Sequence, residues 1–272
     1  MTEEDRLSVF MNLMDRGNGP FLDLIEQEAL EGGVPIIRRS TQSLLRFLIK
    51  LSKPKRILEI GTAVGFSALL MSEAGSEELR IDTIEKYEKR IPVAKGNFER
   101  AFKEKACNMT DLSRIKLFEG DAFDILPTLE GEYDMIFMDA AKGQYINWLP
   151  EIMRLLKTGG LLVSDNCLQD GDVIESRFAV TRRNRTIHSR MREYIYELCH
   201  NPLLDTTILP SGDGVALSTK KAAEEDHYES KEDQYYRQDI HFNTCSVSDL
   251  GPGHRSDDLQ SLKECPDPAD QR

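Results

Sequence analysis

The chain has 272 residues and a formal net charge of -12 at pH 7, a balance that does not favour binding to nucleic acid through overall charge. Its first residues are acidic and no apolar run is long enough for a membrane helix, so we expect a cytoplasmic protein with no membrane partner. The five cysteines are scattered without a CxxC spacing, which is typical of free thiols.

The elements predicted along the chain begin with helices and then alternate. Helices are expected from Thr2 to about Asp15, from Phe21 to Glu31 and from Ser40 to Leu51. Strands are expected at 56–60, 80–85, 115–121, 134–139 and 161–165, separated by helices at 66–74, at 88–105 and in a segment that ends at Gly159-Gly160. A long helix over about 172–198 precedes two last strands at 206–210 and 215–218.

This order predicts an α/β fold: a Rossmann-like, doubly wound sheet of seven strands with N-terminal helices. The Gly212-Asp213-Gly214 turn between the last two apolar runs indicates that this pair is antiparallel. We expect one domain over residues 1–221. Residues 222–272 hold 13 acidic and 5 basic residues and few aliphatic ones, so we expect an acidic, disordered tail there.

The stretch YDMIFMDAAKGQY (133–145) points to a site. Its apolar run predicts a strand buried on both faces, which ends at Asp139. Ligands bind at the carboxyl ends of parallel strands, so Asp139 is a candidate site residue. An aspartate that only caps the next helix would give the same sequence pattern.

The first strand is followed by Gly61-Thr-Ala-Val-Gly65, which lacks the GxGxxG pattern of dinucleotide-binding proteins. Glu85 follows Gly61 by 24 residues and ends the second strand, where its carboxylate could accept hydrogen bonds from both hydroxyls of a ribose. The pair fits a nucleoside cofactor without a pyrophosphate, such as S-adenosylmethionine.

The ordered segments LEIGTAVGFSA, TIEKYEKR, EGDA, YDMIFMDAAKGQY, VSDN and PSGDGVALS resemble the metal-dependent, class I O-methyltransferases of the catechol and caffeoyl-coenzyme A type. Within that family the chain is most similar to the bacterial tRNA 5-hydroxyuridine methyltransferases. The resemblance runs from about Val34 through Lys221 and does not include the tail.

The resemblance implies a role for individual residues. Glu59, Gly61 and Ser67 would line the methionine end of S-adenosylmethionine, and Ile37 would close over it. Glu85 would hold the ribose, Asp121 and Ala122 would border the adenine, and Asp139 would touch both cofactor and metal. The implied metal ligands are Asp139, Asp165 and Asn166, and the implied general base is Lys142.

The residues themselves support a metal site. Asp165 and Asn166 end the fifth strand as Asp139 ends the fourth, so their oxygens should meet at one edge of the sheet. Three hard oxygen ligands suit Mg²⁺ or Mn²⁺. For Lys142 to act as a base, we expect desolvation and the nearby metal charge to lower its pKa.

The sequence favours RNA over a small molecule as substrate through residues 177–192, RFAVTRRNRTIHSRMR. This run has six arginines and no acidic residue, so we expect Arg177, Arg182, Arg183, Arg185 and Arg190 to contact the phosphates of a tRNA anticodon loop. A solvated helix face is the default interpretation of such a run. The predicted reaction is methylation of 5-hydroxyuridine at the wobble position to 5-methoxyuridine.

Two alternatives remain open at this point. A catechol or phenol O-methyltransferase would use the same metal chemistry, because catechol and 5-hydroxyuracil both present two neighbouring oxygens. The catechol enzymes carry a tryptophan just after the first metal aspartate, where this chain has Ala140-Ala141. The other alternative is a binding protein that holds S-adenosylmethionine without catalysis. By resemblance we also expect a homodimer.

Overall fold

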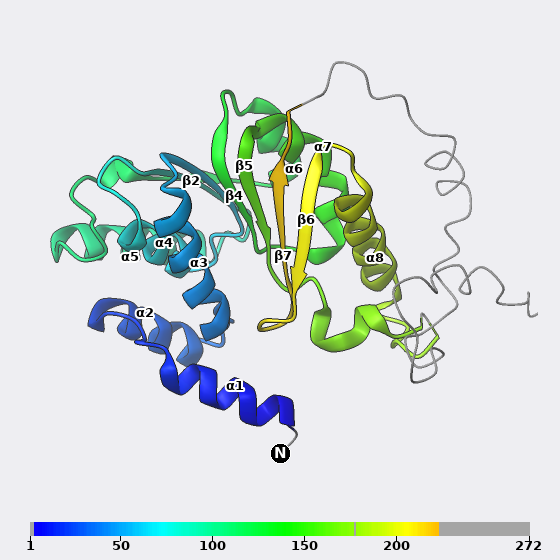
Figure 1. The fold of residues 1–272 in the computed structure, drawn as a ribbon. Coiled ribbons are helices and arrows are strands. Elements are labelled where there is room, and N and C mark those ends of the chain that lie inside the picture. The colour runs from blue at the N-terminus through cyan, green and yellow to red at the C-terminus, as the bar shows by residue number, and fades with distance from the viewer. Residues whose placement is uncertain (1–2, 177, 223–272) are drawn as a thin grey trace, which may run out of the picture.

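The computed structural model describes residues 3–176 and 178–222 and contains the predicted seven-stranded sheet (Figure 1). Its order is β3-β2-β1-β4-β5-β7-β6. The strands are β1 (Arg56–Ile60), β2 (Arg80–Glu85), β3 (Ile115–Glu119), β4 (Tyr133–Met138), β5 (Leu156–Ser164), β6 (Leu204–Leu209) and β7 (Val215–Lys220). The first five pair in parallel, and β7 pairs antiparallel with both β5 and β6, as the Gly-Asp-Gly turn predicts.

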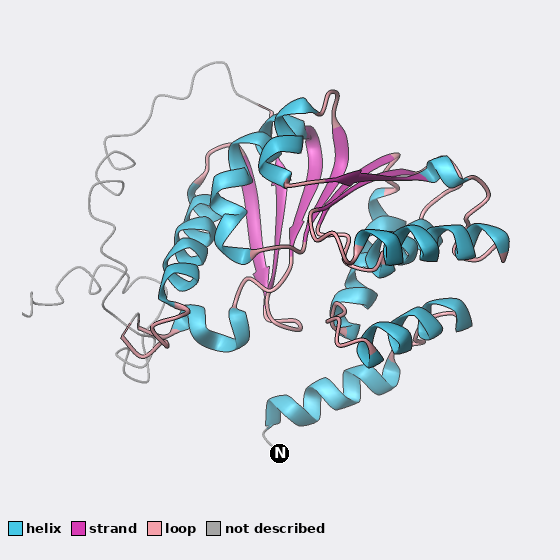
Figure 2. Ribbon diagram, turned by 180° about the vertical axis from the view of Figure 1, so that it is seen from behind, coloured by secondary structure: helices cyan, strands magenta, loops and turns pink. Residues whose placement is uncertain are grey.

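Helices cover both faces of the sheet because successive strand residues point to opposite sides (Figures 1 and 2). Ile57 and Phe137 pack with α2 (Pro20–Glu31), α3 (Arg39–Ser52), α4 (Phe66–Ala74) and α5 (Ile91–Lys103). Leu58 and Ile136, their neighbours along the chain, pack with α6 (Ala122–Ile125), α7 (Tyr145–Leu155) and α8 (Arg185–His200). Residues 135–138 are fully buried, as expected of a central parallel strand.

The short elements of the described chain are four 3₁₀ helices: η1 (Leu112–Arg114), η2 (Leu126–Thr128), η3 (Lys142–Gln144) and η4 (Gln169–Ile174). The N-terminal helix α1 (Glu3–Met14) extends from the body of the molecule (Figure 1). No helix of the described residues is long and apolar enough to cross a membrane.

Two predicted elements differ from the structure. Gly159-Gly160 does not end a helix: α7 stops at Leu155, and both glycines lie inside β5. A step of two residues on β4, from Tyr133 to Met135, matches a step of five on β5, from Leu156 to Leu161, so the glycines lie in an irregular stretch of the strand, where Gly159 takes a φ of +76°.

The helix expected over 172–198 is also wrong in its first half. Only α8, from Arg185, is helical over most of that range, and η4 precedes it. Between them, the N–H groups of Ala179 and Val180 both donate to the Ser176 carbonyl in a turn, and the Val180 side chain is buried. The residues described before Arg185 therefore form turns where the sequence pattern predicts a helix. The Arg177 position and residues 223–272, which include the expected tail, lie outside the described residues.

Candidate active site

The ends of β1, β4 and β5 place three site residues side by side. Beyond the regular ladder, Asp139 N–H donates to the Ile60 carbonyl at 3.0 Å, and Asp165 N–H donates to the Met138 carbonyl at 2.9 Å. Gly61 lies against the same backbone, since a Cβ added to it would stand 2.0 Å from the Asp139 carbonyl oxygen. The predicted meeting of these residues at one edge is therefore present.

The Lys142 ammonium group contacts side-chain oxygens of Asp139 and Asn166 and the backbone carbonyl of Asp165. Its Nζ donates to Asp139 Oδ1 at 2.8 Å, to Asn166 Oδ1 at 2.6 Å and to the Asp165 carbonyl at 3.3 Å. The Tyr145 hydroxyl lies 3.1 Å from the same Nζ and donates to the Met138 carbonyl at 2.9 Å. These oxygens converge on one positive charge.

Asp165 is buried, and Thr41 Oγ1 donates to its Oδ1 at 3.3 Å. Burial, and then the negative charge of Asp139, raise the pKa of Asp165 to about 6. Two carboxylates that repel each other and an amide oxygen form a hard donor set that fits Mg²⁺ or Mn²⁺. The described residues contain no group of three His, Cys, Asp or Glu able to hold a metal, because the third ligand here is an asparagine.

The pKa of Lys142 is raised in this structure, contrary to the expectation that it is lowered. Burial acts to lower it, but the charges of Tyr145 and Asp139 and the hydrogen bonds to them outweigh burial. The ammonium is stabilised because it donates hydrogen bonds to these oxygens and lies beside the negative charge of Asp139.

The expected cofactor residues lie along the same edge of the sheet. Glu59 is fully buried in β1 and accepts hydrogen bonds from the hydroxyls of Ser67 and Thr83. Burial is the main cause that raises the pKa of Glu59 to about 7, while those two hydrogen bonds lower it. Glu59 is thus poised between its neutral and ionised forms near neutral pH.

Glu85 ends β2, and its carboxylate accepts the N–H groups of Ala63 at 2.7 Å and Tyr87 at 2.8 Å. These bonds fix the carboxylate against the loop that follows β1. Ile37 is buried, and the side chain of Gln42 donates to its carbonyl at 2.9 Å.

Asp121 comes just after β3 and caps α6 by accepting the Phe123 N–H at 2.9 Å. It also pairs with Lys86 at 3.1 Å, and the next residue, Ala122, is buried. Glu59, Glu85 and Asp121 therefore lie on or just after β1, β2 and β3, of which β1 neighbours β4 in the sheet, and the predicted metal-ligand residues directly follow β4 and β5.

The arginine run divides into exposed and internally bonded members. Arg182 and Arg183 are exposed. Arg185 Nε donates to the Val180 carbonyl at 3.3 Å, and Arg190 Nη1 donates to the Gly143 carbonyl at 2.9 Å. Gly143 follows Lys142 in η3, so Arg190 joins α8 to the loop that carries the candidate base.

Two contributors to the site had no sequence signal strong enough to assign them a role. Tyr145 stands three residues after Lys142, a spacing that lets two side chains meet in a helical turn. Thr41 lies 124 residues from Asp165 in the sequence, and no local pattern predicts their contact.

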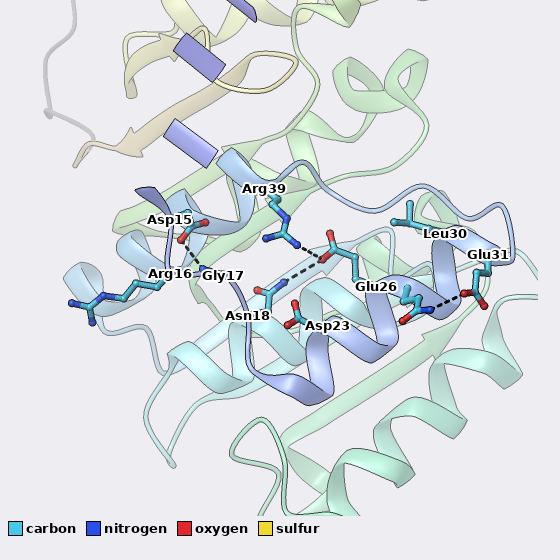
Figure 3. A pocket seen from close by; sticks show the side chains of 10 residues that line it. Asp15, Arg16, Gly17, Asn18, Asp23, Glu26, Leu30, Glu31 and Arg39 are labelled. Atoms are coloured by element: carbon cyan, nitrogen blue, oxygen red, sulfur yellow. Dashed lines mark hydrogen bonds and ion pairs between the residues drawn. The ribbon is translucent and has the colours of Figure 1, made fainter. Parts of the chain in front are cut away.

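A hollow of about 580 Å³ lies among the N-terminal helices (Figure 3). Arg39 there pairs with Glu26 at 3.6 Å, and Asn18 Nδ2 lies 3.5 Å from the same carboxylate. This pair joins two opposite charges within the lining of the hollow. Its lining residues are Asp15, Arg16, Gly17, Asn18, Asp23, Glu26, Gln27, Leu30, Glu31 and Arg39.

The sequence is similar to those of known methyltransferases. The sequence model of a family described as O-methyltransferase matches residues 28–221. The chain is 33% identical over 202 residues to a catechol O-methyltransferase of Niastella koreensis, with 70% of this chain and 86% of that protein covered. It is 32% identical over 188 residues to caffeoyl-CoA O-methyltransferase 2 of Populus trichocarpa, with 64% and 70% covered.

Among solved structures, the SAH-bound methyltransferase PaMTH1 of Podospora anserina is similar, with a TM-score of 0.69 and 30% identity. The similarity covers 82% of this chain and 97% of that one.

Proposed function

Because the chain belongs to the O-methyltransferase family, we propose that it transfers the methyl group of S-adenosylmethionine to 5-hydroxyuridine at the wobble position of tRNA. The product is 5-methoxyuridine. The cofactor assignment is supported by the SAH-bound relative PaMTH1 and by the row of Glu59, Ser67 and Glu85 at the carboxyl edge of the sheet. The acceptor base lies unpaired in the anticodon loop, where it can be read in a pocket.

The observation that carries the choice of RNA is the placement of the arginine run beside the candidate base. Arg182 and Arg183 expose their charges at the start of the segment that leads into α8, and Arg190 of α8 bonds to the loop of Lys142. Exposed cations on a segment that continues into the helix bonded to the Lys142 loop suit a polyanion whose one base enters the site.

The proposed chemistry uses the gathered oxygens. Asp139, Asp165 and Asn166 would hold Mg²⁺ or Mn²⁺, which supplies a positive charge that lowers the pKa of the substrate hydroxyl and orients two neighbouring oxygens. The ammonium form of Lys142 is disfavoured when a second positive charge lies among the same oxygens. Lys142 Nζ then accepts the hydroxyl proton, while Tyr145 keeps the amine in place.

Nucleoside mass spectrometry tests the reaction. Hydroxyuridine-containing tRNA is incubated with the protein, S-adenosylmethionine and Mg²⁺, beside a catechol sample and a chelator sample. Conversion of 5-hydroxyuridine to its methyl ether, abolished by chelator, is the expected result. Methylation of the catechol alone would overturn the choice of RNA.

The arginines allow a sharper test. The double variant Arg182→Ala with Arg183→Ala should weaken tRNA binding and lower the slope of log Kd against log salt by roughly 1 to 2, as expected for the loss of two phosphate contacts. Methylation of the free nucleoside should be unchanged. The matched control removes two exposed lysines far from this surface, Lys55→Ala with Lys103→Ala, and should keep the wild-type slope.

The second candidate is a small-molecule catechol or phenol O-methyltransferase, which the names of the curated relatives favour. It predicts turnover without RNA and no effect of the Arg182 and Arg183 substitutions. The two candidates share the cofactor and metal residues, so only the acceptor assay and the arginine variants separate them.

Assembly as a homodimer belongs to the same proposal. Helix α1 exposes a set of large apolar side chains, and α3 exposes Phe47 and Leu51. Such surfaces are typical of protein interfaces. Light scattering of the purified protein should give the mass of two chains, and Phe47→Glu should shift it toward one. The exposed apolar residues of α1 are Val9, Phe10, Met11, Leu13 and Met14.

A further inference from the structure

The turn between β6 and β7 is docked on the backbone that follows the candidate metal ligand Asn166. The N–H of Cys167 donates to the Gly214 carbonyl at 2.8 Å, and the N–H of Leu168 donates to the Asp213 carbonyl at 2.9 Å. Gly214 has a φ of +79°, and a Cβ there would stand 2.3 Å from Leu168 Cγ. The glycines of the Gly-Asp-Gly turn therefore permit an approach that brings Asp213 beside the active site.

Asn166 lies between two charges of opposite sign. Its Oδ1 accepts from Lys142 Nζ at 2.6 Å, and its Nδ2 lies 3.4 Å from Asp213 Oδ2. The backbone of Asn166 also has a φ of +55°, a left-handed conformation that residues other than glycine adopt infrequently. Both its backbone and its side chain are thus held in one arrangement.

The amide of an asparagine has two ends of different chemistry. Only the oxygen can bind a metal cation, and a rotation of the amide by half a turn would present two N–H donors instead. A carboxylate beside the nitrogen favours the orientation with the oxygen toward the metal position, because a hydrogen bond from N–H to an ionised acceptor is stronger than one to a neutral acceptor.

We infer that Asp213 is a positioning residue that orients the Asn166 amide so that its oxygen faces the metal position. This inference rests on the proposed metal-assisted function. Asp213 does not touch the metal position itself: it acts through Asn166. Arg38 Nη1 donates to the Gly212 carbonyl at 3.1 Å and helps to hold the turn in place.

The test measures Mn²⁺ binding to the full chain by calorimetry and by the electron paramagnetic resonance signal of free Mn²⁺. Asp213→Ala removes the acceptor and should weaken Mn²⁺ binding by about 10- to 100-fold, the range typical of lost outer-shell partners. Asp213→Asn keeps an oxygen acceptor but loses the charge that strengthens the hydrogen bond, so it should weaken binding by less than Asp213→Ala does. Affinity for S-adenosylhomocysteine and the Tm should stay near the wild-type values in both.

The matched control is Asp205→Ala. Asp205 lies on β6 of the same hairpin and pairs with Lys221 at 3.2 Å, so its loss removes an equal charge without touching Asn166. Mn²⁺ affinity should not change in this variant. Should Asp213→Ala fail to fold, Asp213→Ser takes its place, because its shorter side chain falls away from Asn166 Nδ2.

The outcomes separate this inference from the proposed function. If the wild type binds Mn²⁺ and the two variants Asp213→Ala and Asp213→Asn lose affinity equally, the inference is overturned, because loss of the negative charge alone would explain both losses. Undiminished binding in Asp213→Ala would overturn it too. A wild-type protein that binds no Mn²⁺ would overturn the metal-assisted function itself, and the inference with it.

Discussion

The substitution Glu59→Gln is expected to stabilise the ligand-free protein at neutral pH and to weaken its binding of S-adenosylmethionine. The Glu59 carboxyl group is buried in β1, away from water, and accepts hydrogen bonds from the hydroxyls of Ser67 and Thr83. Burial raises its pKa from an ordinary 4.5 to about 7. A neutral glutamine avoids the free energy that ionising this buried carboxyl requires.

The magnitude follows from the difference between the two pKa values. Each tenfold change in proton affinity corresponds to about 1.4 kcal/mol, so the rise in the pKa of Glu59 corresponds to about 3 kcal/mol. The folded state holds the proton more tightly than the unfolded state does. The contribution to stability is therefore fully present below pH 4.5, falls as the pH rises, and is lost above about pH 7.

Urea unfolding from pH 4.5 to pH 8 measures this effect. The free energy of unfolding of Glu59→Gln minus that of wild type should increase by about 3 kcal/mol across this range and level off above pH 7. The exposed control Glu130→Gln should follow the wild-type pH dependence. A difference that is the same at pH 5 and pH 8 would show that Glu59 does not gain a proton on folding, and the reasoning would be wrong.

The same substitution that stabilises the ligand-free protein should weaken its binding of the cofactor. S-adenosylmethionine carries positive charge on its amino and sulfonium groups, so the ionised form of Glu59 should bind it better. Glu59→Gln should weaken binding by roughly 10- to 100-fold, the value of a hydrogen bond to a charged group. Calorimetry in two buffers of different ionisation enthalpy should also detect proton release by the wild type near pH 6.

Three further substitutions test the active-site edge. Thr41→Val removes the hydroxyl that holds Asp165 and should weaken Mn²⁺ binding by about tenfold in calorimetry, whereas Thr41→Ser should retain most of it. Gly61→Ala forces a Cβ against the Asp139 carbonyl and should lower the free energy of unfolding in urea by about 1–3 kcal/mol or more; an unchanged value would mean that the loop yields freely. Asp139→Ala should abolish methylation in the mass-spectrometric assay, and activity that persists in chelator would contradict the metal mechanism.

The sheet and the position of the site could be predicted from the sequence because both depend on short-range patterns. The strands at 56–60 and 80–85 lie where short apolar runs predict them, and most of their residues are buried. Asp139 and Asp165 come one residue after their strands, and parallel strands bring their carboxyl ends to one edge. Residue types at strand ends thus predicted which side chains would meet.

Local patterns failed where a residue's role depends on its neighbours in space. The Gly159-Gly160 pair has the signature of a helix end, but it lies in an irregular stretch of β5, where the register against β4 shifts. The segment before Arg185 is predicted to be helical, but it forms turns, and the side chain of Val180 is buried there. In both places tertiary contacts outweigh the small free energies of local propensity.

By itself, then, the sequence determined the α/β architecture, the order of the motifs and the set of oxygen-bearing residues at the sheet edge. The tertiary structure alone decided how those residues are held: Thr41 on Asp165 and Arg190 on Gly143 join segments 124 and 47 residues apart. It also placed Lys142 beside the oxygens of Asp139 and Tyr145, which raise its pKa instead of lowering it. Periodicity reports which face of an element is buried, whereas the partner of a polar side chain depends on how separate elements pack.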